Sequence, residues 1–196
     1  PAAEVEAAGG LYLDAPISGG PVKAAAGKLS VMASGAQAAF DKARPLLDAA
    51  AETVFELGDA PGPGSTMKMV NQLLAGVHIA SAMEAMALAI KSGLDADTVF
   101  KVITASAGNS WMFENRVPHV LENDYSPKSA VDIFIKDLGI VLAQGERLDF
   151  PLPISQTALQ RFQEAKDMGL GRADDASVIK VYQRDGGFAL PGDEET

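Results

Sequence analysis

The 196-residue sequence has no cysteine, two histidines and one tryptophan. Without cysteine the chain has neither a disulfide framework nor a thiolate metal site. The two histidines, His78 and His119, lie far apart in the sequence, so we expect no metal centre. The chain also lacks a Gly-x-Gly-x-x-Gly turn after a strand, which is the usual fingerprint of dinucleotide binding. A Ser/His/Asp hydrolase arrangement or nucleophile elbow is missing as well.

Basic residues are few and scattered: the chain has 16 Lys and Arg against 26 Asp and Glu, and a net charge of −10. This balance argues against a nucleic-acid or anionic-membrane partner, but not against a small anionic substrate. The longest uncharged stretch contains Asn71, Gln72 and His78, and we interpret it as too short and too polar to cross a bilayer. With no basic amino-terminal segment before an apolar run, we expect a cytoplasmic protein.

Two compositional halves meet near residue 62. The first half has strand-like patterns at Gly10–Pro16, Leu29–Ser34 and Thr53–Leu57, and a helical pattern at Ala36–Ala51. Because three strands and one helix leave sheet faces uncovered, this half is typical of the end of a larger α/β domain. The first residues resemble the end of a helix that runs into a strand.

From Gly64 onward the strand patterns stop and apolar residues recur at helical spacing. The expected helices are Ser65–Lys91, Ala96–Ala105, Ser110–Leu121, Ser129–Leu148, Pro153–Met168 and Asp175–Arg184. The first would be roughly 40 Å long, and its many small residues favour a spine and a seam between copies of the chain. Gly93 is expected to end it and Asp95 to cap the next helix. We expect the acidic tail Gly192–Thr196 to be disordered.

Lys68 opens a helical run with no formal charge from Met69 to Met83. Desolvation disfavours an ammonium group, so a partly buried lysine can exchange a proton near neutral pH. Asn71 and Gln72 follow at positions that share its helical face. This set suits a hydroxy or oxo acid, with the lysine moving a proton and an amide orienting the oxygen. The spacing also fits an ordinary solvated lysine.

The segment Asp14–Gly20 ends a predicted strand with Pro16-Ile17-Ser18-Gly19-Gly20. Backbone N–H groups of such a glycine turn can approach a ligand closely, and with the Ser18 hydroxyl they could bind a carboxylate. The same residues also fit an everyday turn.

Lys136 and Asp137 lie on the predicted helix Ser129–Leu148. Lys136 is off the apolar stripe of that helix, which comprises Val131, Phe134, Leu138, Val141 and Leu142. Asp132 precedes Lys136 by four residues, so a surface ion pair of about 0.3–0.5 kcal/mol is an alternative to a role in a site.

Taken together and in this order, the three segments resemble the β-hydroxyacid dehydrogenases, relatives of 6-phosphogluconate and 3-hydroxyisobutyrate dehydrogenases. The family has an Asp-Ala-Pro-x-Ser-Gly-Gly turn, matched by Asp14–Gly20, and a Gly-x-x-x-Lys-x-x-Asn-Asn helix start, matched by Gly64–Gln72. It also has a later Lys-Asp-Leu, matched by Lys136–Leu138. The resemblance extends from about Leu11 to Gly187 and favours the chemical interpretation of each segment.

The resemblance implies residue roles. Lys68 would be the catalytic residue, and Ser18, Gly19 and Gly20, with Asn71 and Gln72, would bind the substrate. The remaining two candidates, Lys136 and Asp137, would lie beside an NAD or NADP cofactor. Gln72 departs from the family, which has a second asparagine there, so the substrate hydroxyl could sit differently.

The resemblance also implies a fold that is mostly α. Residues 63–196 would form an all-helical 6-phosphogluconate dehydrogenase-like domain for substrate binding and dimerisation, with a long helix at about 64–91. Residues 1–62 would be the last strands and helix of a truncated Rossmann-type α/β domain, without its Gly-rich loop. We therefore expect the chain by itself to be inactive, and the parent enzyme to be a homo-oligomer.

Within the family, residues 108–118 and 129–139 are most similar to the L-threonate dehydrogenase branch. The expected reaction is oxidation of a short hydroxy acid, with L-threonate first. Reduction of 2-hydroxy-3-oxopropionate (tartronate semialdehyde) and oxidation of 3-hydroxyisobutyrate are alternatives. An alternative of another kind is a non-catalytic helical oligomerisation module, in which the lysines have no special role.

Overall fold

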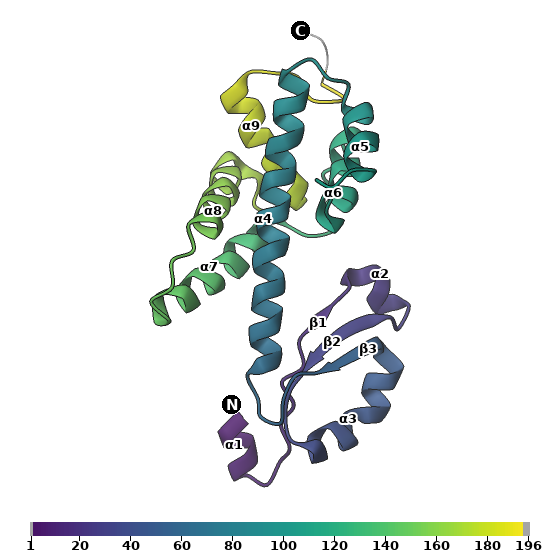
Figure 1. Cartoon of the computed structure of the whole chain (residues 1–196), viewed down its shortest axis with the longest axis vertical. Coiled ribbons are helices and arrows are strands. Elements are labelled where there is room, and N and C mark those ends of the chain that lie inside the picture. The colour runs from purple at the N-terminus through teal and green to yellow at the C-terminus, as the bar shows by residue number, and fades with distance from the viewer. Residues whose placement is uncertain (1, 194–196) are drawn as a thin grey trace. The chain divides into compact units, whose positions relative to one another are not determined.

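Helix α4 (Pro63–Lys91) contains the boundary between the two units into which the chain divides. The computed structural model describes residues 2–193, and Figure 1 shows its helices and strands. We call residues 1–71 the sheet unit and residues 72–196 the helical unit. The composition predicts a boundary after residue 62, whereas the structure groups the first turns of α4 with the sheet.

The sheet unit has three strands in the order β1-β2-β3. Strand β1 (Ile17–Ser18) pairs antiparallel with β2 (Leu29–Ala33), and β2 pairs parallel with β3 (Ala51–Glu56). Parallel strands need a crossover connection, which is helix α3 (Gln37–Ala50). Figure 1 shows α3 lying against this small sheet. Val31, Ala33, Phe40 and Leu47 form its buried apolar core.

The predictions for β2, α3 and β3 are confirmed, but the first strand is wrong. The predicted strand Gly10–Pro16 forms an isolated bridge between Asp14 and Ser34, and the paired strand is the two residues of β1. Pro16 has no N–H for a ladder bond, and its carbonyl accepts a bond from the Met32 N–H at 2.9 Å.

Two short helices flank these strands. Helix α1 (Ala2–Ala7) agrees with the expected helical opening. Helix α2 (Gly20–Ala25) is missed by the sequence pattern, because Gly19, Gly20 and Pro21 look like a turn. Proline in the first turn of a helix is favourable, so the residues that suggest a turn in fact begin a helix.

The helical unit contains the expected helices, with ends close to the predicted ones. They are α5 (Ala96–Thr104), α6 (Trp111–Leu121), α7 (Val131–Arg147), α8 (Pro153–Ala165), the π-helical segment Lys166–Leu170, the 3₁₀ segment Asp175–Val178 and α9 (Ile179–Gly186). The Asp95 side chain caps α5, accepting a bond from the Thr98 N–H at 2.8 Å. Helix α8 ends before the predicted Met168, because Gly169 adopts a φ of 83°.

Apolar packing around α4 forms the core of the helical unit. Figure 1 shows α5 and α6 on one side of this part of α4 and α8 and α9 on the other. Ile79, Met83 and Met86 of α4 are fully buried, as is Phe162 of α8. The ring of Phe162 stacks on Phe134 of α7 with centroids 5.3 Å apart.

Helix α4 is long and apolar enough to cross a membrane by length and composition. This corrects the sequence interpretation, because the few polar residues in the run do not outweigh the apolar ones. Its buried residues nevertheless belong to the core of the helical unit. We therefore interpret α4 as a core helix.

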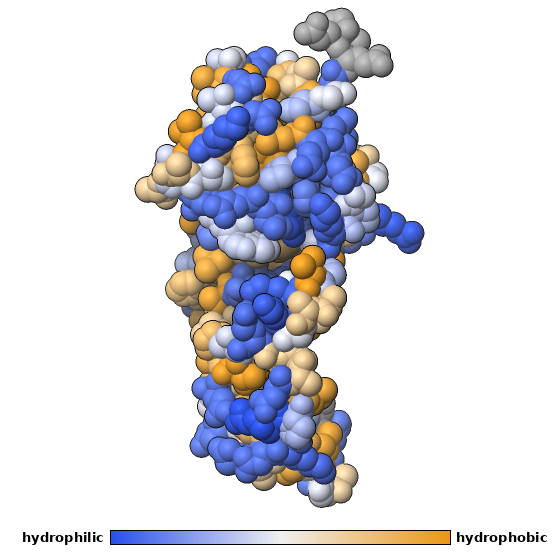
Figure 2. Space-filling view, turned by 90° about the vertical axis from the view of Figure 1, so that its right-hand side faces the viewer, coloured by the Kyte–Doolittle hydropathy of each residue, from blue (hydrophilic) through white to orange (hydrophobic). Residues whose placement is uncertain are grey.

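Some apolar side chains remain at the surface of the helical unit, as Figure 2 shows among the polar residues. Large examples are Leu88, Trp111, Leu148, Phe150 and Ile154. In the tail expected to be disordered, Gly192 and Asp193 are placed, and the Asp193 carboxylate accepts a bond from the Leu190 N–H at 2.8 Å. Residues 194–196 of that tail lie outside the described residues.

Candidate active site

The start of α4, which carries Lys68, is held by the carboxylate of Asp14. The Asp14 Oδ2 atom accepts bonds from the backbone N–H groups of Ser65 at 2.8 Å and Gly62 at 3.0 Å. Its Oδ1 atom accepts a bond from the Ser65 hydroxyl at 2.6 Å. Because the first N–H groups of a helix lack partners within the helix, this carboxylate acts as a cap from a distant part of the sequence.

Ser34 completes the cap. Its hydroxyl accepts a bond from the Gly64 N–H at 3.0 Å and donates to Asp14 Oδ2 at 3.3 Å. The backbones of Asp14 and Ser34 are also paired, with N–H···O distances of 3.0 and 2.8 Å. A pair of bridged residues therefore supplies both side chains that bind the helix start.

Position 64 requires glycine because backbone atoms of two other segments lie close to it. A Cβ atom at this position would lie 2.4 Å from the Met32 carbonyl oxygen and 2.8 Å from the Asp14 carbonyl oxygen. Both are backbone atoms, so the clash cannot be relieved by a side-chain rotation. The start of α4 thus packs directly on the backbone next to the sheet.

The electrostatics of the cap favour an ionised Asp14. Burial raises the pKa of the Asp14 carboxyl, but the bonds from Ser65, Gly62 and Ser34 lower it more, so the pKa lies below its ordinary value. A carboxylate at a helix amino terminus also interacts favourably with the helix dipole.

The predicted carboxylate-binding turn lies in the same unit. Ser18 ends β1 and is half-buried, and Gly19 and Gly20 lead into α2. Gly19 has a φ of 138°, and a Cβ there would lie 2.9 Å from the Cβ of Lys23. Gly20 has a φ of 68° with open space around it. Both positions therefore favour glycine by backbone angle.

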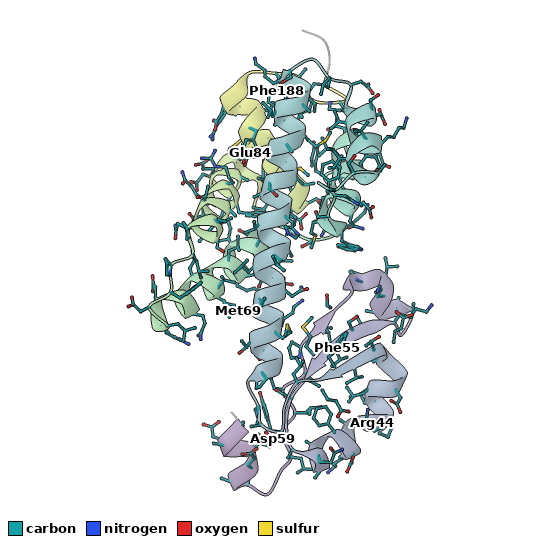
Figure 3. The ribbon with its side chains drawn as sticks, viewed as in Figure 1. Arg44, Phe55, Asp59, Met69, Glu84 and Phe188 are labelled. Carbon is teal, nitrogen blue, oxygen red and sulfur yellow. The ribbon has the colours of Figure 1, made fainter. Side chains whose placement is uncertain are left out.

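Lys68 and Asn71 lie in the first turns of α4, and both are half-buried. Met69, labelled in Figure 3, follows Lys68 and marks this part of the helix. Residues three apart share a helical face, so the ammonium and the Asn71 amide project from the same side. The sheet unit thus contains five of the eight predicted site residues: Ser18, Gly19, Gly20, Lys68 and Asn71.

The other three predicted residues, Gln72, Lys136 and Asp137, meet in the helical unit. The Gln72 Nε2 atom donates to Asp137 Oδ2 at 2.6 Å, and the Lys136 ammonium pairs with Asp137 Oδ1 at 3.0 Å. Asp137 is 11% exposed, whereas Lys136 is 66% exposed. The carboxylate of Asp137 therefore orients an amide from α4 and an exposed ammonium on α7.

The surface ion pair between Asp132 and Lys136, an alternative from the sequence, is not formed within the described residues. Asp132, the proposed surface partner of Lys136, pairs instead with Lys166 at 3.0 Å. Lys136 is bound by the adjacent Asp137.

A second polar cluster is buried in the helical unit. The Asp174 carboxylate lies 2.8 Å from His119 Nδ1, and the Lys128 ammonium lies 3.2 Å from His119 Nε2. Arg116 pairs with Asp175 at 2.5 Å. Burial raises the pKa of Asp175, and the bonds and charge of Arg116 offset only part of this effect. We assign this cluster to stability, since it has backbone and ion-pair partners.

Within residues 2–193, no group of three or more His, Asp or Glu side chains is arranged to hold a metal ion. The predicted site residues offer ammonium, amide, hydroxyl and backbone N–H donors, and Asp137 offers a carboxylate. Such donors bind carboxylates and move protons.

The capping residues Asp14, Ser34 and Ser65 are the part of the site that sequence reasoning missed. In the sequence, Asp14 is the first residue of the turn motif, and the motif gives it no separate role. A local capping pattern would place the cap next to the helix, whereas Asp14 and Ser65 are 51 positions apart. Pairing of β2 with the segment before β1 would have been needed to find them.

Residues 62–182 match the family model described as NAD-binding of NADP-dependent 3-hydroxyisobutyrate dehydrogenase. The chain belongs to the 3-hydroxyisobutyrate dehydrogenase family. Residues 1–58 match a second model, the NAD-binding domain of 6-phosphogluconate dehydrogenase. The two matches correspond to the resemblance seen in the sequence motifs.

Several members of the 3-hydroxyisobutyrate dehydrogenase family are similar to this chain. L-threonate dehydrogenase of Escherichia coli K12 is 54% identical over 180 residues, which are 92% of this chain and 59% of that protein. A crystal structure of 3-hydroxyisobutyrate dehydrogenase from Salmonella typhimurium is 55% identical with a TM-score of 0.88, and the match covers 92% of this chain and 63% of that one.

A third relative was solved with a cofactor. Psf3 in complex with NADP⁺ and 2-OPP is 27% identical, with a TM-score of 0.81, over 92% of this chain and 63% of that one. The chain thus spans about three fifths of the length of these relatives. The names of the first two of these relatives differ in substrate, so identity by itself does not choose between those substrates.

Proposed function

We propose that the whole protein is an NAD(P)-dependent dehydrogenase that oxidises a short hydroxy acid, with L-threonate as its substrate. The observation that carries the proposal is the capped start of α4, which holds the half-buried Lys68 in the same unit as the Ser18-Gly19-Gly20 turn. The similarity of residues 108–118 and 129–139 to the L-threonate dehydrogenase branch, together with the 54% identity to an L-threonate dehydrogenase, supports the choice of substrate.

The sheet unit would bind the acid and move the proton. The Ser18 hydroxyl and the backbone N–H groups of Gly19 and Gly20 would hold the substrate carboxylate. On oxidation, the neutral amine of Lys68 would take the proton of the reacting hydroxyl, and on reduction the ammonium would return it. The Asn71 amide would orient the reacting oxygen.

In the helical unit, the proposed roles fall to Gln72, Lys136 and Asp137. Gln72 is oriented by Asp137, so its amide would present a fixed group to the substrate. The exposed ammonium of Lys136 suits contact with a polar or anionic cofactor group, and Asp137 would hold it in place. When bound, the nicotinamide would accept the hydride from the carbinol carbon. A Gly-rich pyrophosphate turn is not part of this sequence.

Further proposals concern the rest of the protein. Residues 1–62 would be the end of an NAD(P)-binding Rossmann-type domain, and residues 63–196 the helical substrate and dimerisation domain. The whole protein would be a cytoplasmic homo-oligomer with a small hydroxy acid as its partner. The 196-residue chain by itself would show no dehydrogenase activity, because its sequence has no Gly-rich turn to bind the cofactor pyrophosphate.

A substrate panel with the whole protein tests the function. Oxidation of L-threonate and of 3-hydroxyisobutyrate, and reduction of 2-hydroxy-3-oxopropionate, are measured with NAD(H) and with NADP(H). We expect the highest kcat/KM for L-threonate. A higher value for another acid would assign that substrate instead, and the better cofactor form decides between NAD and NADP.

Absence of turnover with every acid and both cofactor forms would contradict the proposal. That outcome would favour the non-catalytic helical oligomerisation module. Turnover by the 196-residue chain itself would contradict the proposed location of the cofactor site.

A further inference from the structure

The Asp14 carboxylate joins two predicted reactive segments of the sheet unit through its hydrogen bonds to Gly62 and Ser65. It is the first residue of the segment that ends in Ser18, Gly19 and Gly20. Its carboxylate binds the first turn of α4, one turn before Lys68. The two segments are far apart in the sequence, and the side chain of one caps the other.

We infer that Asp14 is a positioning residue, which holds Lys68 in register with the carboxylate-binding turn. The inference rests on the proposed function for its kinetic readout. It assigns to Asp14 a role through other groups, since its two carboxylate oxygens bind Ser65, Gly62 and Ser34.

Each of the first N–H groups of α4 has a hydrogen-bond partner. The Gly64 N–H binds Ser34, the Ser65 N–H binds Asp14, and the Thr66 N–H binds the Gly62 carbonyl oxygen at 2.9 Å. Pro63 has no N–H group. Two of these three bonds reach back to the Asp14–Ser34 bridge, so the helix start is tied to that bridge.

Several features restrict movement of the first turn of α4 relative to the Asp14–Ser34 bridge. Asp14 is 8% exposed and Ser34 is fully buried. Gly64 lies against two backbone carbonyl oxygens, so the helix start cannot move closer to the bridge. Several short bonds to one ionised carboxylate are stronger than neutral hydrogen bonds. Together these contacts fix both the distance and the rotation of the first turn of α4.

The consequence for catalysis follows from geometry. Proton transfer requires the lysine nitrogen within hydrogen-bond reach of the reacting oxygen. The acid is held at the other end of the Asp14–Gly20 segment in the proposed function. A shift of about 1 Å between such groups can reduce the rate on the order of a hundredfold. Loss of the Asp14 bonds should therefore affect turnover even in a folded protein.

The main variant is Asp14→Asn in the whole protein. The amide keeps the size of the side chain, but it has one oxygen acceptor in place of two and presents N–H donors to the N–H groups of the helix start. We expect kcat to fall about tenfold to a hundredfold, with a smaller change in KM for the cofactor. The matched control is Asp41→Asn, an exposed aspartate on α3 of the same unit, which should leave kcat unchanged.

A second variant, Ser65→Ala, removes only one of the hydrogen bonds to Asp14. Ser65→Ala deletes the hydroxyl that donates to Asp14 Oδ1 at 2.6 Å and keeps the backbone N–H bond to Oδ2. We expect a smaller fall in kcat with a normal fold. If Asp14→Asn does not fold, Ser65→Ala decides the question, and a wild-type kcat in Ser65→Ala would then overturn the inference.

Hydrogen exchange of backbone amides gives a readout that does not depend on activity. The N–H groups of Gly62 and Ser65 should be protected in the wild-type protein and should exchange faster in Asp14→Asn, with little change in the helical unit. A folded Asp14→Asn variant with wild-type kcat would overturn the inference. Loss of activity in Lys68→Ala beside normal activity in Asp14→Asn and Ser65→Ala would overturn the positioning role and leave the proposed function standing.

Discussion

Different interactions stabilise the two units of the chain. The sheet unit has a small apolar core of Val31, Ala33, Phe40 and Leu47, and the start of α4 is bound to it by hydrogen bonds to Asp14 and Ser34. The helical unit has an extensive apolar core around the middle of α4. The comparison teaches that the predicted proton-transfer group is placed by a polar anchor, whereas the helical scaffold is placed by packing.

The largest expected effect concerns the packed core. Phe162 is fully buried and stacks on Phe134, so Phe162→Ala should lower the free energy of unfolding by about 3–5 kcal/mol. Denaturant unfolding of the variant measures the loss. The control Phe150→Ala removes a ring that is 62% exposed and should change stability by less than about 0.5 kcal/mol. Equal losses in both would contradict the assigned core.

A similar or slightly smaller loss is expected for the buried ion pair of the helical unit. Arg116→Ala would leave the fully buried Asp175 carboxylate without its charged partner, which costs about 3–5 kcal/mol. The control Arg44→Ala breaks an exposed pair with Glu56 at 2.8 Å, and Figure 3 labels Arg44 on α3. Thermal unfolding should show little change in this control.

The pH dependence of Arg116→Ala follows from the sign of the Asp175 shift. Burial raises the pKa of this carboxyl, so the folded state binds more protons than the unfolded state between the two pKa values. Stability due to this group therefore falls as the pH rises through that interval. Without Arg116 the upward shift of the Asp175 pKa is larger. The loss of stability in Arg116→Ala should therefore shrink as the pH is lowered. A deficit that grows at low pH would contradict this account.

A smaller effect is expected where the start of α4 packs on the backbone next to the sheet. Gly64→Ala would force a methyl group toward backbone oxygens of Met32 and Asp14, and overpacking of this kind costs about 1–3 kcal/mol. Gly139→Ala is the matched control, since Gly139 lies in α7 with open space around its Cα. Replacing a helical glycine with alanine there should stabilise the protein by up to about 1 kcal/mol.

Unfolding curves of the two variants measure the difference. If Gly64→Ala were as stable as the wild type, the helix start could shift away from Asp14 and Ser34. That result would weaken the polar anchor and with it the contrast between the two units.

Much of the fold could be predicted from the sequence. In the predicted stripe of α7, Val131, Phe134, Leu138 and Val141 are buried as expected and Leu142 is partly buried, because helical periodicity is a local signal. The Asp95 cap and the Gly93 stop are local as well, and Gly93 has the expected positive φ of 86°. Local patterns of this kind determine where a helix begins, where it ends and which face it buries.

The rest depended on contacts between distant residues. The Asp14 bond to Ser65 needs the pairing of the segment before β1 with the end of β2. The Gln72 bond to Asp137 needs α4 to pack against α7. Helix α2 was hidden by Gly20 and Pro21, which fit a turn as well as a helix start. In each case tertiary contacts decided between local alternatives that sequence spacing left open.

The most direct test of the central claim is the turnover of Lys68→Ala in the whole protein. With saturating L-threonate and cofactor, kcat should fall by about 10²–10⁴-fold, the usual contribution of a positioned acid–base group. Lys101→Ala, at an exposed lysine on α5, should keep the wild-type rate, and both variants should unfold like the wild type. A folded Lys68→Ala protein with near-normal turnover would contradict the account.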